Sequence, residues 1–139
     1  MTSDQDRWEL LLKDGQGFAA DIAEEHAKYQ QTDDDDYDGT CERGDIEYEL
    51  QQRPLSVEVR SCWRSMNQPW EAGEYRILLS TGGPAMQVTG KLDMYDQPAD
   101  AVVEVQDWFK PWTEITTTTP DQDAALLWFA SLFYYGAEE

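Results

Sequence analysis

The sequence predicts an α+β fold, with acidic helices in the first half, an antiparallel meander of four to five strands in the second, and a C-terminal helix packed on the sheet. Three observations predict it. Apolar residues recur at helical spacing before residue 53, they alternate with polar residues after it, and short turns separate the alternating segments. Short turns join antiparallel neighbours, because parallel strands need a long crossover.

Length and composition indicate one folded domain over residues 1–139, with an acidic, mainly helical part (1–53) and a part holding the sheet and the last helix (54–139). Aromatic residues make up 12% of the chain, whereas disordered acidic chains are poor in them. No basic, apolar leader or membrane-length apolar run is visible, and two cysteines do not form a disulfide framework. These features favour a cytoplasmic protein.

Two helices are predicted in the first 31 residues. The first carries Trp8 and Leu11 on one face, and we expect Gly15 and Gly17 to break it. The second follows over residues 18–31, with apolar and polar positions on separate stripes.

A third, short helix is favoured for the segment around Ile46 and Leu50, ending before Pro54, and an alternating strand is the other interpretation. From Leu55 onward the apolar period becomes two, which is typical of half-buried strands. The turns between these segments contain Gly, Pro and Asp. The strands are predicted at residues 55–62, 75–80, 86–92 and 101–106, with a possible fifth at 113–118.

The last helix is predicted to begin at Pro120. Thr119 is a suitable N-cap, and Asp121 and Asp123 fall in the first turn, where the helix dipole favours negative charge. Gly136 is expected to end the helix. A broad apolar stripe along it predicts that the helix covers one face of the sheet.

Two strings in the second half resemble a known family. They are Arg76-Ile-Leu-Leu-Ser-Thr-Gly-Gly-Pro-Ala85 and Gln106-Asp-Trp-Phe-Lys-Pro-Trp-Thr-Glu114. Together they resemble small acidic proteins encoded by phages, plasmids and bacterial mobile elements, over residues 54–136. The resemblance implies no catalytic activity. It implies a setting in which small acidic proteins act against host defence by binding nucleases or CRISPR complexes.

Charge is the strongest functional signal. The chain has 29 Asp and Glu against 10 Lys and Arg, a formal net charge of -19. Such a surface repels nucleic acid and anionic membranes and attracts basic proteins. Carboxylates concentrated in the first 50 residues could imitate a row of DNA phosphates. We therefore predict that the partner contacts Asp21, Glu24, Glu25, Asp33, Asp34, Asp35, Asp36, Asp38, Glu42, Asp45, Glu47 and Glu49.

An Asp-rich segment offers a calcium-binding alternative. Asp34, Asp36, Asp38, Gly39 and Asp45 match positions 1, 3, 5, 6 and 12 of an EF-hand loop. Position 12 departs from the pattern, because Glu is usual there. A solvated acidic loop is the other interpretation, and we expect no metal and no cofactor.

Aromatic residues cluster near the end of the sheet, at Trp108, Phe109 and Trp112. They are expected either to pack under the sheet with Trp63 and Trp70 or to form an exposed protein-binding patch. Neither this cluster nor the single histidine, His26, suggests catalysis, because no nucleophile stands in a recognisable setting.

The sequence therefore predicts a non-enzymatic acidic inhibitor from a mobile element, which binds a basic nucleic-acid-binding protein of host defence by imitating DNA. An immunity or antitoxin-like protein for a basic toxin would bind its partner by the same electrostatic attraction, and it stays open as an alternative. So does the calcium-binding module. None of these interpretations involves direct contact with nucleic acid or a membrane.

Overall fold

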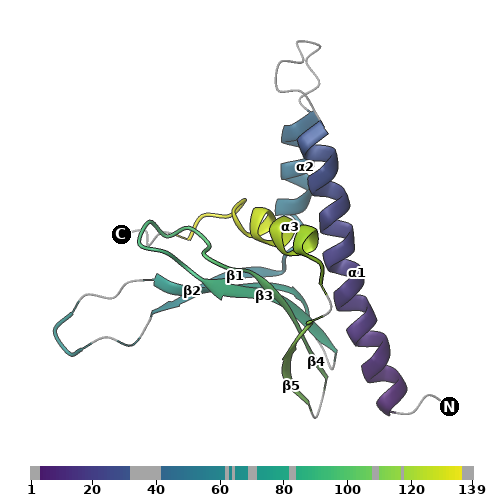
Figure 1. Cartoon of the computed structure of the whole chain (residues 1–139). Helices are drawn as coiled ribbons and strands as arrows, with labels where there is room; N and C mark the ends of the chain where they lie inside the picture. The colour runs from purple at the N-terminus through teal and green to yellow at the C-terminus, as the bar shows by residue number, and fades with distance from the viewer. Residues whose placement is uncertain are drawn as a thin grey trace.

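The computed structural model describes residues 4–31, 42–61, 63, 65–68, 72–81, 84–107, 110–116 and 118–135 (Figure 1). Five strands form one sheet in the order β1-β2-β3-β4-β5, each antiparallel to its neighbours, so the predicted α+β meander is confirmed. The elements are α1 (Asp4–Gln31), α2 (Glu42–Gln51), β1 (Ser56–Ser61), β2 (Ala72–Ser80), β3 (Ala85–Lys91), β4 (Val102–Asp107), β5 (Lys110–Glu114) and α3 (Pro120–Ala130).

One continuous helix replaces the two helices predicted before residue 32. The prediction of a break at Gly15 and Gly17 was wrong, because an isolated interior glycine costs only about 1 kcal/mol and tertiary packing outweighs it. Gly15 is buried where α1 meets the sheet. A Cβ atom there would lie 2.9 Å from Cγ1 of Ile115 and 3.1 Å from Cγ1 of Val105. The glycine therefore allows close approach and does not end the helix.

The short helix α2 ends at Gln51, before Pro54, as predicted. It lies beside α1, and both helices extend beyond the sheet and α3 (Figure 1). Leu50, which is fully buried, joins α2 to the core.

The fifth strand lies earlier in the chain than predicted. It covers Lys110–Glu114 and not residues 113–118, and Ile115 follows it with its backbone N–H donated to the carbonyl of Val103. The Thr-rich stretch at 116–119 has strand-forming composition. The fifth strand begins at Lys110, opposite Asp107 at the end of β4, and the start of β4 at Val102 leaves few partners for residues that follow Ile115.

One face of the sheet carries the core. Ile77, Val88 and Val103 are register partners across β2, β3 and β4, and all three are fully buried. Phe129 and Leu126 of α3 belong to the same buried cluster, so the predicted packing of the C-terminal helix on the sheet is confirmed. Alternation along the strands sends the polar side chains to the opposite face.

The edge strand β1 is less covered than its alternation predicts. Val57 and Val59 lie opposite Ile77 and Tyr75 on the core side, yet they are 38% and 36% exposed. The prediction of a half-buried strand overstated the burial of these two side chains. The reason is that β1 is at the edge of the sheet, beyond the centre of the packed cluster.

The N-terminus of α3 matches the prediction. The Thr119 side chain accepts from the backbone N–H of Gln122, and the Gln122 side chain accepts from the backbone N–H of Thr119, which completes a capping box. Asp121 and Asp123 lie in the first turn. The predicted end was wrong: the helix stops at Ala130, where Ser131 caps it, and Gly136 lies outside the described residues.

Candidate functional site

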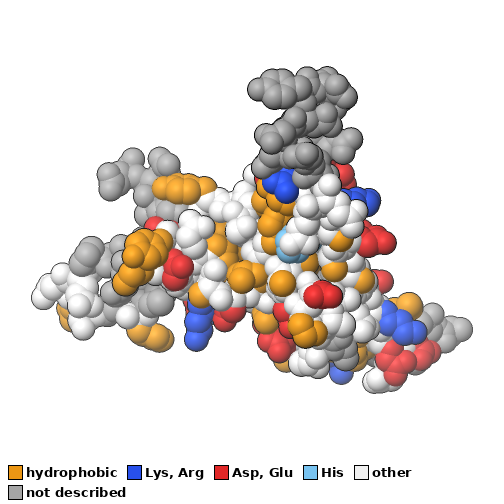
Figure 2. All heavy atoms as spheres, turned by 45° about the horizontal axis from the view of Figure 1, so that its top comes forward, with side chains coloured by type: hydrophobic (Ala, Val, Ile, Leu, Met, Phe, Trp, Pro, Cys, Tyr) orange, Lys and Arg blue, Asp and Glu red, His pale blue; other side chains and the backbone are white. Residues whose placement is uncertain are grey.

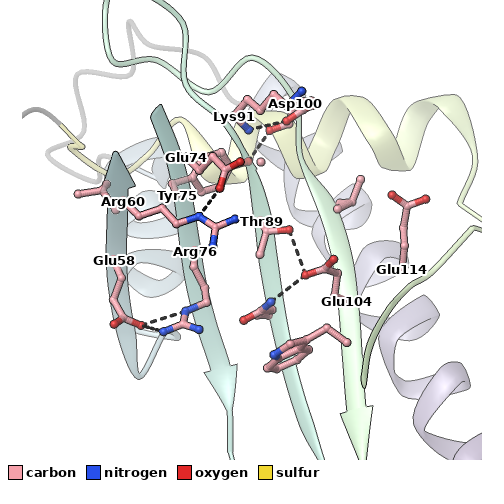
Figure 3. A pocket seen from close by; sticks show the side chains of 15 residues that line it. Glu58, Arg60, Glu74, Tyr75, Arg76, Thr89, Lys91, Asp100, Glu104 and Glu114 are labelled. Carbon is pink, nitrogen blue, oxygen red and sulfur yellow. Dashed lines mark hydrogen bonds and ion pairs between the residues drawn. The ribbon is translucent and has the colours of Figure 1, made fainter. Parts of the chain in front are cut away.

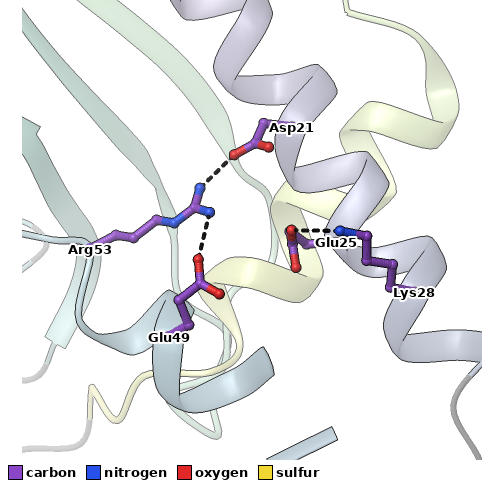
Figure 4. A network of polar contacts seen from close by, with 5 residues as sticks. All are labelled: Asp21, Glu25, Lys28, Glu49 and Arg53. Atoms are coloured by element: carbon purple, nitrogen blue, oxygen red, sulfur yellow. Dashed lines mark hydrogen bonds and ion pairs between the residues drawn. The ribbon is translucent and has the colours of Figure 1, made fainter. Parts of the chain in front are cut away.

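Arg53 brings two of the predicted partner-binding carboxylates together. Its guanidinium donates to Asp21 of α1 at 2.6 Å and to Glu49 of α2 at 3.2 Å (Figure 4). Burial opposes the charge on Arg53, but the hydrogen bonds with Asp21 and Glu49 outweigh it, so the pKa of Arg53 rises above its ordinary value. Arg53 therefore links the two helices, and it neutralises part of the predicted acidic surface.

Two further predicted carboxylates also have partners within the protein. Glu25 pairs with Lys28 at 3.4 Å, and Glu47 accepts a hydrogen bond from the Tyr29 hydroxyl at 2.7 Å. Figure 2 shows that acidic and basic side chains intermingle along α1. The described part of the hairpin formed by α1 and α2 is thus less negative than its acidic residues alone suggest.

The remaining predicted carboxylates fall into three groups. Glu24 and Asp45 are exposed, and neither has an ion pair within the described part of the chain. The side chain of Glu42 is not described. The others lie outside the described residues: Asp33, Asp34, Asp35, Asp36 and Asp38.

Of the suggested calcium ligands, Asp45 alone falls on a described element. It lies in the first half of α2 with its side chain exposed. Across the residues that the structure describes, no three His, Cys, Asp or Glu side chains gather in a way that could hold a metal ion. The calcium-binding alternative therefore depends on residues outside the described ranges.

His26 is held by aromatic contact. Its ring stacks on Trp128 of α3 with centroids 4.7 Å apart, and Tyr29 packs on the same indole at 5.1 Å. Burial lowers the pKa of His26 below its ordinary value. The geometry indicates a residue at the junction of α1 and α3.

This environment predicts a pH dependence of stability. The unfolded chain protonates His26 near its ordinary pKa of about 6.5, whereas the folded protein does so only at lower pH, so unfolding is favoured as the pH falls through that value. We expect the free energy of unfolding to decrease between about pH 7.5 and 5.5, and to decrease less in His26→Gln. Urea unfolding at several pH values measures this, and equal slopes for the two proteins would contradict it.

Trp63, a member of the predicted aromatic cluster, does not pack under the sheet. That side chain is fully exposed, with a relative accessibility of 102%, so its assignment to the core was wrong. Trp112 is half-buried and lines the polar face of the sheet, away from the core. Trp70, Trp108 and Phe109 lie outside the described residues.

The polar face of the sheet is hollowed. Residues from all five strands line a concavity of about 710 Å³, which we call the open face (Figure 3). On β1 and β2 its charges are matched: Glu58 accepts from Arg76 at 2.7 Å, and Glu74 pairs with Arg60. The charged side chains that line it are Glu58, Arg60, Glu74, Arg76, Lys91, Asp100, Glu104 and Glu114.

The half of the open face on β3, β4 and β5 differs from the matched half. Gln87, Glu104 and Glu114 are successive register partners on these strands, so their side chains stand in a row. Glu104 and Glu114 are labelled in Figure 3. We call these three residues the acceptor row. Sequence reasoning missed them, because alternation shows which residues share a face of one strand but not which residues become neighbours across strands.

Comparisons with known proteins identify no family for this chain. No protein-family model, no curated protein and no solved structure matches it. The resemblance to acidic proteins of mobile elements therefore stays a prediction. No described helix combines the length and the apolar character that crossing a bilayer requires.

Proposed function

We propose that the protein is a non-enzymatic acidic inhibitor that binds a basic nucleic-acid-binding protein in place of nucleic acid. The observation that carries the proposal is the charge, which is -19 on 139 residues. Residues 1–53 contain 16 of the 29 acidic residues and 5 of the 10 basic ones. A charge of this size steers encounter with a cationic groove and disfavours contact with nucleic acid itself.

The hairpin of α1 and α2 supports the proposal through its position. It extends beyond the sheet (Figure 1), so carboxylates on it can enter a groove that the sheet cannot reach. Glu24 and Asp45 are exposed there without ion pairs in the described residues. The contacts of Arg53 with both helices favour a fixed geometry, which reduces the conformational entropy lost on binding.

The setting of the proposal comes from the sequence. The resemblance to proteins of mobile elements favours a host defence nuclease or a CRISPR effector as the target. Both have cationic grooves that bind phosphates through Lys and Arg, and carboxylates at suitable spacing can occupy the same side chains.

Capture from a bacterial lysate tests this function. The immobilised protein is exposed to the lysate at low salt and eluted with a NaCl gradient, and the fractions are identified by mass spectrometry. We expect one basic nuclease or CRISPR complex to leave in a sharp step, because exposed charge pairs are screened as salt rises. A diffuse series of ribosomal and other cationic proteins would contradict the proposal.

A further inference from the structure

The two edges of the sheet differ in how they are protected from further pairing. Within the described residues β1 pairs with β2 alone, so its other side presents backbone N–H and C=O groups along an edge. Edge strands commonly avoid a further partner through Lys and Pro. The opposite edge strand, β5, begins with Lys110 and Pro111, whereas β1 contains neither residue type. The edge that can accept another strand is therefore β1.

Apolar side chains are exposed along this edge. Val57 and Val59 are on the core side of the sheet, yet both are exposed. Two larger apolar side chains flank the strand: Leu55, just before it, is 61% exposed, and Trp63, just after it, is fully exposed. A strand added beside β1 would cover apolar surface that the described part of the chain leaves accessible, which favours association.

The polar side of β1 carries one charge of each sign. Glu58 and Arg60 are both exposed, and each lies opposite a residue of β2 with the opposite charge. Glu58 pairs with Arg76, and Arg60 pairs with Glu74 (Figure 3). The four charges sum to zero, so this edge lacks the negative excess of the whole chain. A second copy of the same strand has the charges needed to continue the alternation.

The charge pattern selects one register for two antiparallel copies of β1. Opposite residues of antiparallel strands share a face, so valines meet valines only when one residue lies on the two-fold axis. With Val59 on the axis, Glu58 of each copy lies opposite Arg60 of the other. With Glu58 or Arg60 on the axis, that residue meets its own counterpart, and like charges destabilise a sheet. With Val57 on the axis, Glu58 meets only Ser56.

We propose that β1 binds β1 of a second copy of this chain in antiparallel register, with Val59 on a two-fold axis perpendicular to the sheet. Two five-stranded sheets then form one sheet of ten strands. Across the polar face the charges alternate in the order Arg76, Glu58, Arg60 and Glu74, the last two from the second copy. The pairing uses the open edge of each copy, so assembly stops at the dimer.

The core side of the dimer joins the exposed apolar side chains. Val59 packs against its counterpart on the axis, and the same register brings Leu55 near Trp63 of the second copy. The net charge of -19 opposes this association, but 16 of the 29 acidic residues lie in residues 1–53, before β1. At physiological salt the Debye length is about 8 Å, so repulsion between charges farther apart than this is largely screened.

Sedimentation velocity of the full chain tests the pairing. It is measured in about 150 mM NaCl at protein concentrations from about 1 to about 300 μM, the range in which a small interface dissociates. We expect the mass to rise with concentration from 16.0 kDa to twice that value. A mass that stays at 16.0 kDa throughout, or one that grows beyond the dimer, would overturn the inference.

Val59→Lys tests whether the dimer forms through β1. We expect the dissociation constant to rise at least about tenfold, because two lysines then meet on the axis and an apolar pair is lost. Tyr48→Lys is the matched control, since it also replaces an exposed apolar side chain by lysine, but on α2. Its effect is expected to stay below about twofold. Thermal unfolding verifies that both variants fold, and equal effects on association would overturn the inference.

A mixing experiment tests the register. Glu58→Arg places two arginines opposite each other in its homodimer, and Arg60→Glu places two glutamates there, so each variant alone associates weakly. A mixture restores opposite charges at both positions, and we expect it to associate at least about tenfold more tightly than either variant. Glu9→Arg mixed with Lys13→Glu, which makes the same charge changes on α1, is expected to show no such preference. A mixture no tighter than its components would overturn the inference.

Pairing through β1 is independent of the proposed function. If the chain stays a monomer but captures a basic protein, the pairing is wrong and the proposed function stands. If the chain dimerises through β1 but captures no basic protein, the pairing stands and the proposed function is wrong.

Discussion

Gly90→Ala is expected to lower the free energy of unfolding by about 3 kcal/mol, which corresponds to a fall in melting temperature of roughly 10 °C. Gly90 lies in β3 opposite Tyr75. A Cβ atom there would lie 2.0 Å from the carbonyl oxygen of Asp100 and 2.7 Å from Cε1 of Tyr75. Both distances are far inside van der Waals contact.

The surroundings of Gly90 cannot easily relax. The Tyr75 hydroxyl donates to the carbonyl of Asp100 at 2.5 Å, and the side chain of Asp100 accepts from the backbone N–H of Lys91 at 2.7 Å. Tyr75 is 2% exposed and packs on Tyr135 with ring centroids 4.9 Å apart. A methyl group therefore has to displace backbone, a buried ring or both.

Gly17→Ala is the matched control. A Cβ atom at Gly17 meets nothing within 4 Å, and the position is inside α1, so alanine is expected to stabilise the protein by up to about 1 kcal/mol. Urea unfolding of the two variants and the wild type measures both effects. A Gly90→Ala protein as stable as Gly17→Ala would contradict the packing described around β3.

Reversing the four consecutive aspartates, Asp33, Asp34, Asp35 and Asp36, to lysine is expected to abolish inhibition of the basic partner. Each reversal exchanges attraction for repulsion in a cationic groove, so the combined loss of affinity is expected to exceed about a hundredfold. The melting temperature is expected to stay close to that of the wild type. Affinity is measured by calorimetry with the captured partner, and retained inhibition would contradict the assignment of this segment.

A smaller reversal has a control of equal charge. The double variant Asp34→Lys/Asp36→Lys changes the net charge by the same amount as the double variant Glu9→Lys/Asp14→Lys. Glu9 and Asp14 both lie on the N-terminal half of α1. We expect the first pair to weaken binding at least about tenfold more than the second. Equal losses would mean that the partner responds to total charge and not to the Asp-rich segment.

Local patterns predicted most of the fold. The capping residues Thr119 and Pro120 and the alternation after Leu55 were sufficient for α3 and the meander, because each signal acts within a few residues. Gly15 misled the prediction because its role depends on Ile115, a hundred residues later in the chain. The position of β5 depended likewise on pairing with β4, which composition does not specify.

The candidate site was less predictable than the fold. Counting charges identified the acidic first half, but it gave no sign that Arg53 joins Asp21 to Glu49. The acceptor row depends on register across three strands, and residues 87, 104 and 114 have no recognisable spacing in the sequence. Interactions between distant residues thus decided which carboxylates are neutralised within the protein.

Displacement by DNA tests the central claim most directly. The complex with the captured basic protein is titrated with double-stranded DNA at fixed salt, and the bound fraction of the acidic protein is measured. If the protein occupies the groove that binds nucleic acid, DNA competes with it for that groove. The bound fraction of the acidic protein then falls as the fraction of the partner that is bound to DNA rises. A complex that remains intact while the partner binds DNA normally would contradict the account.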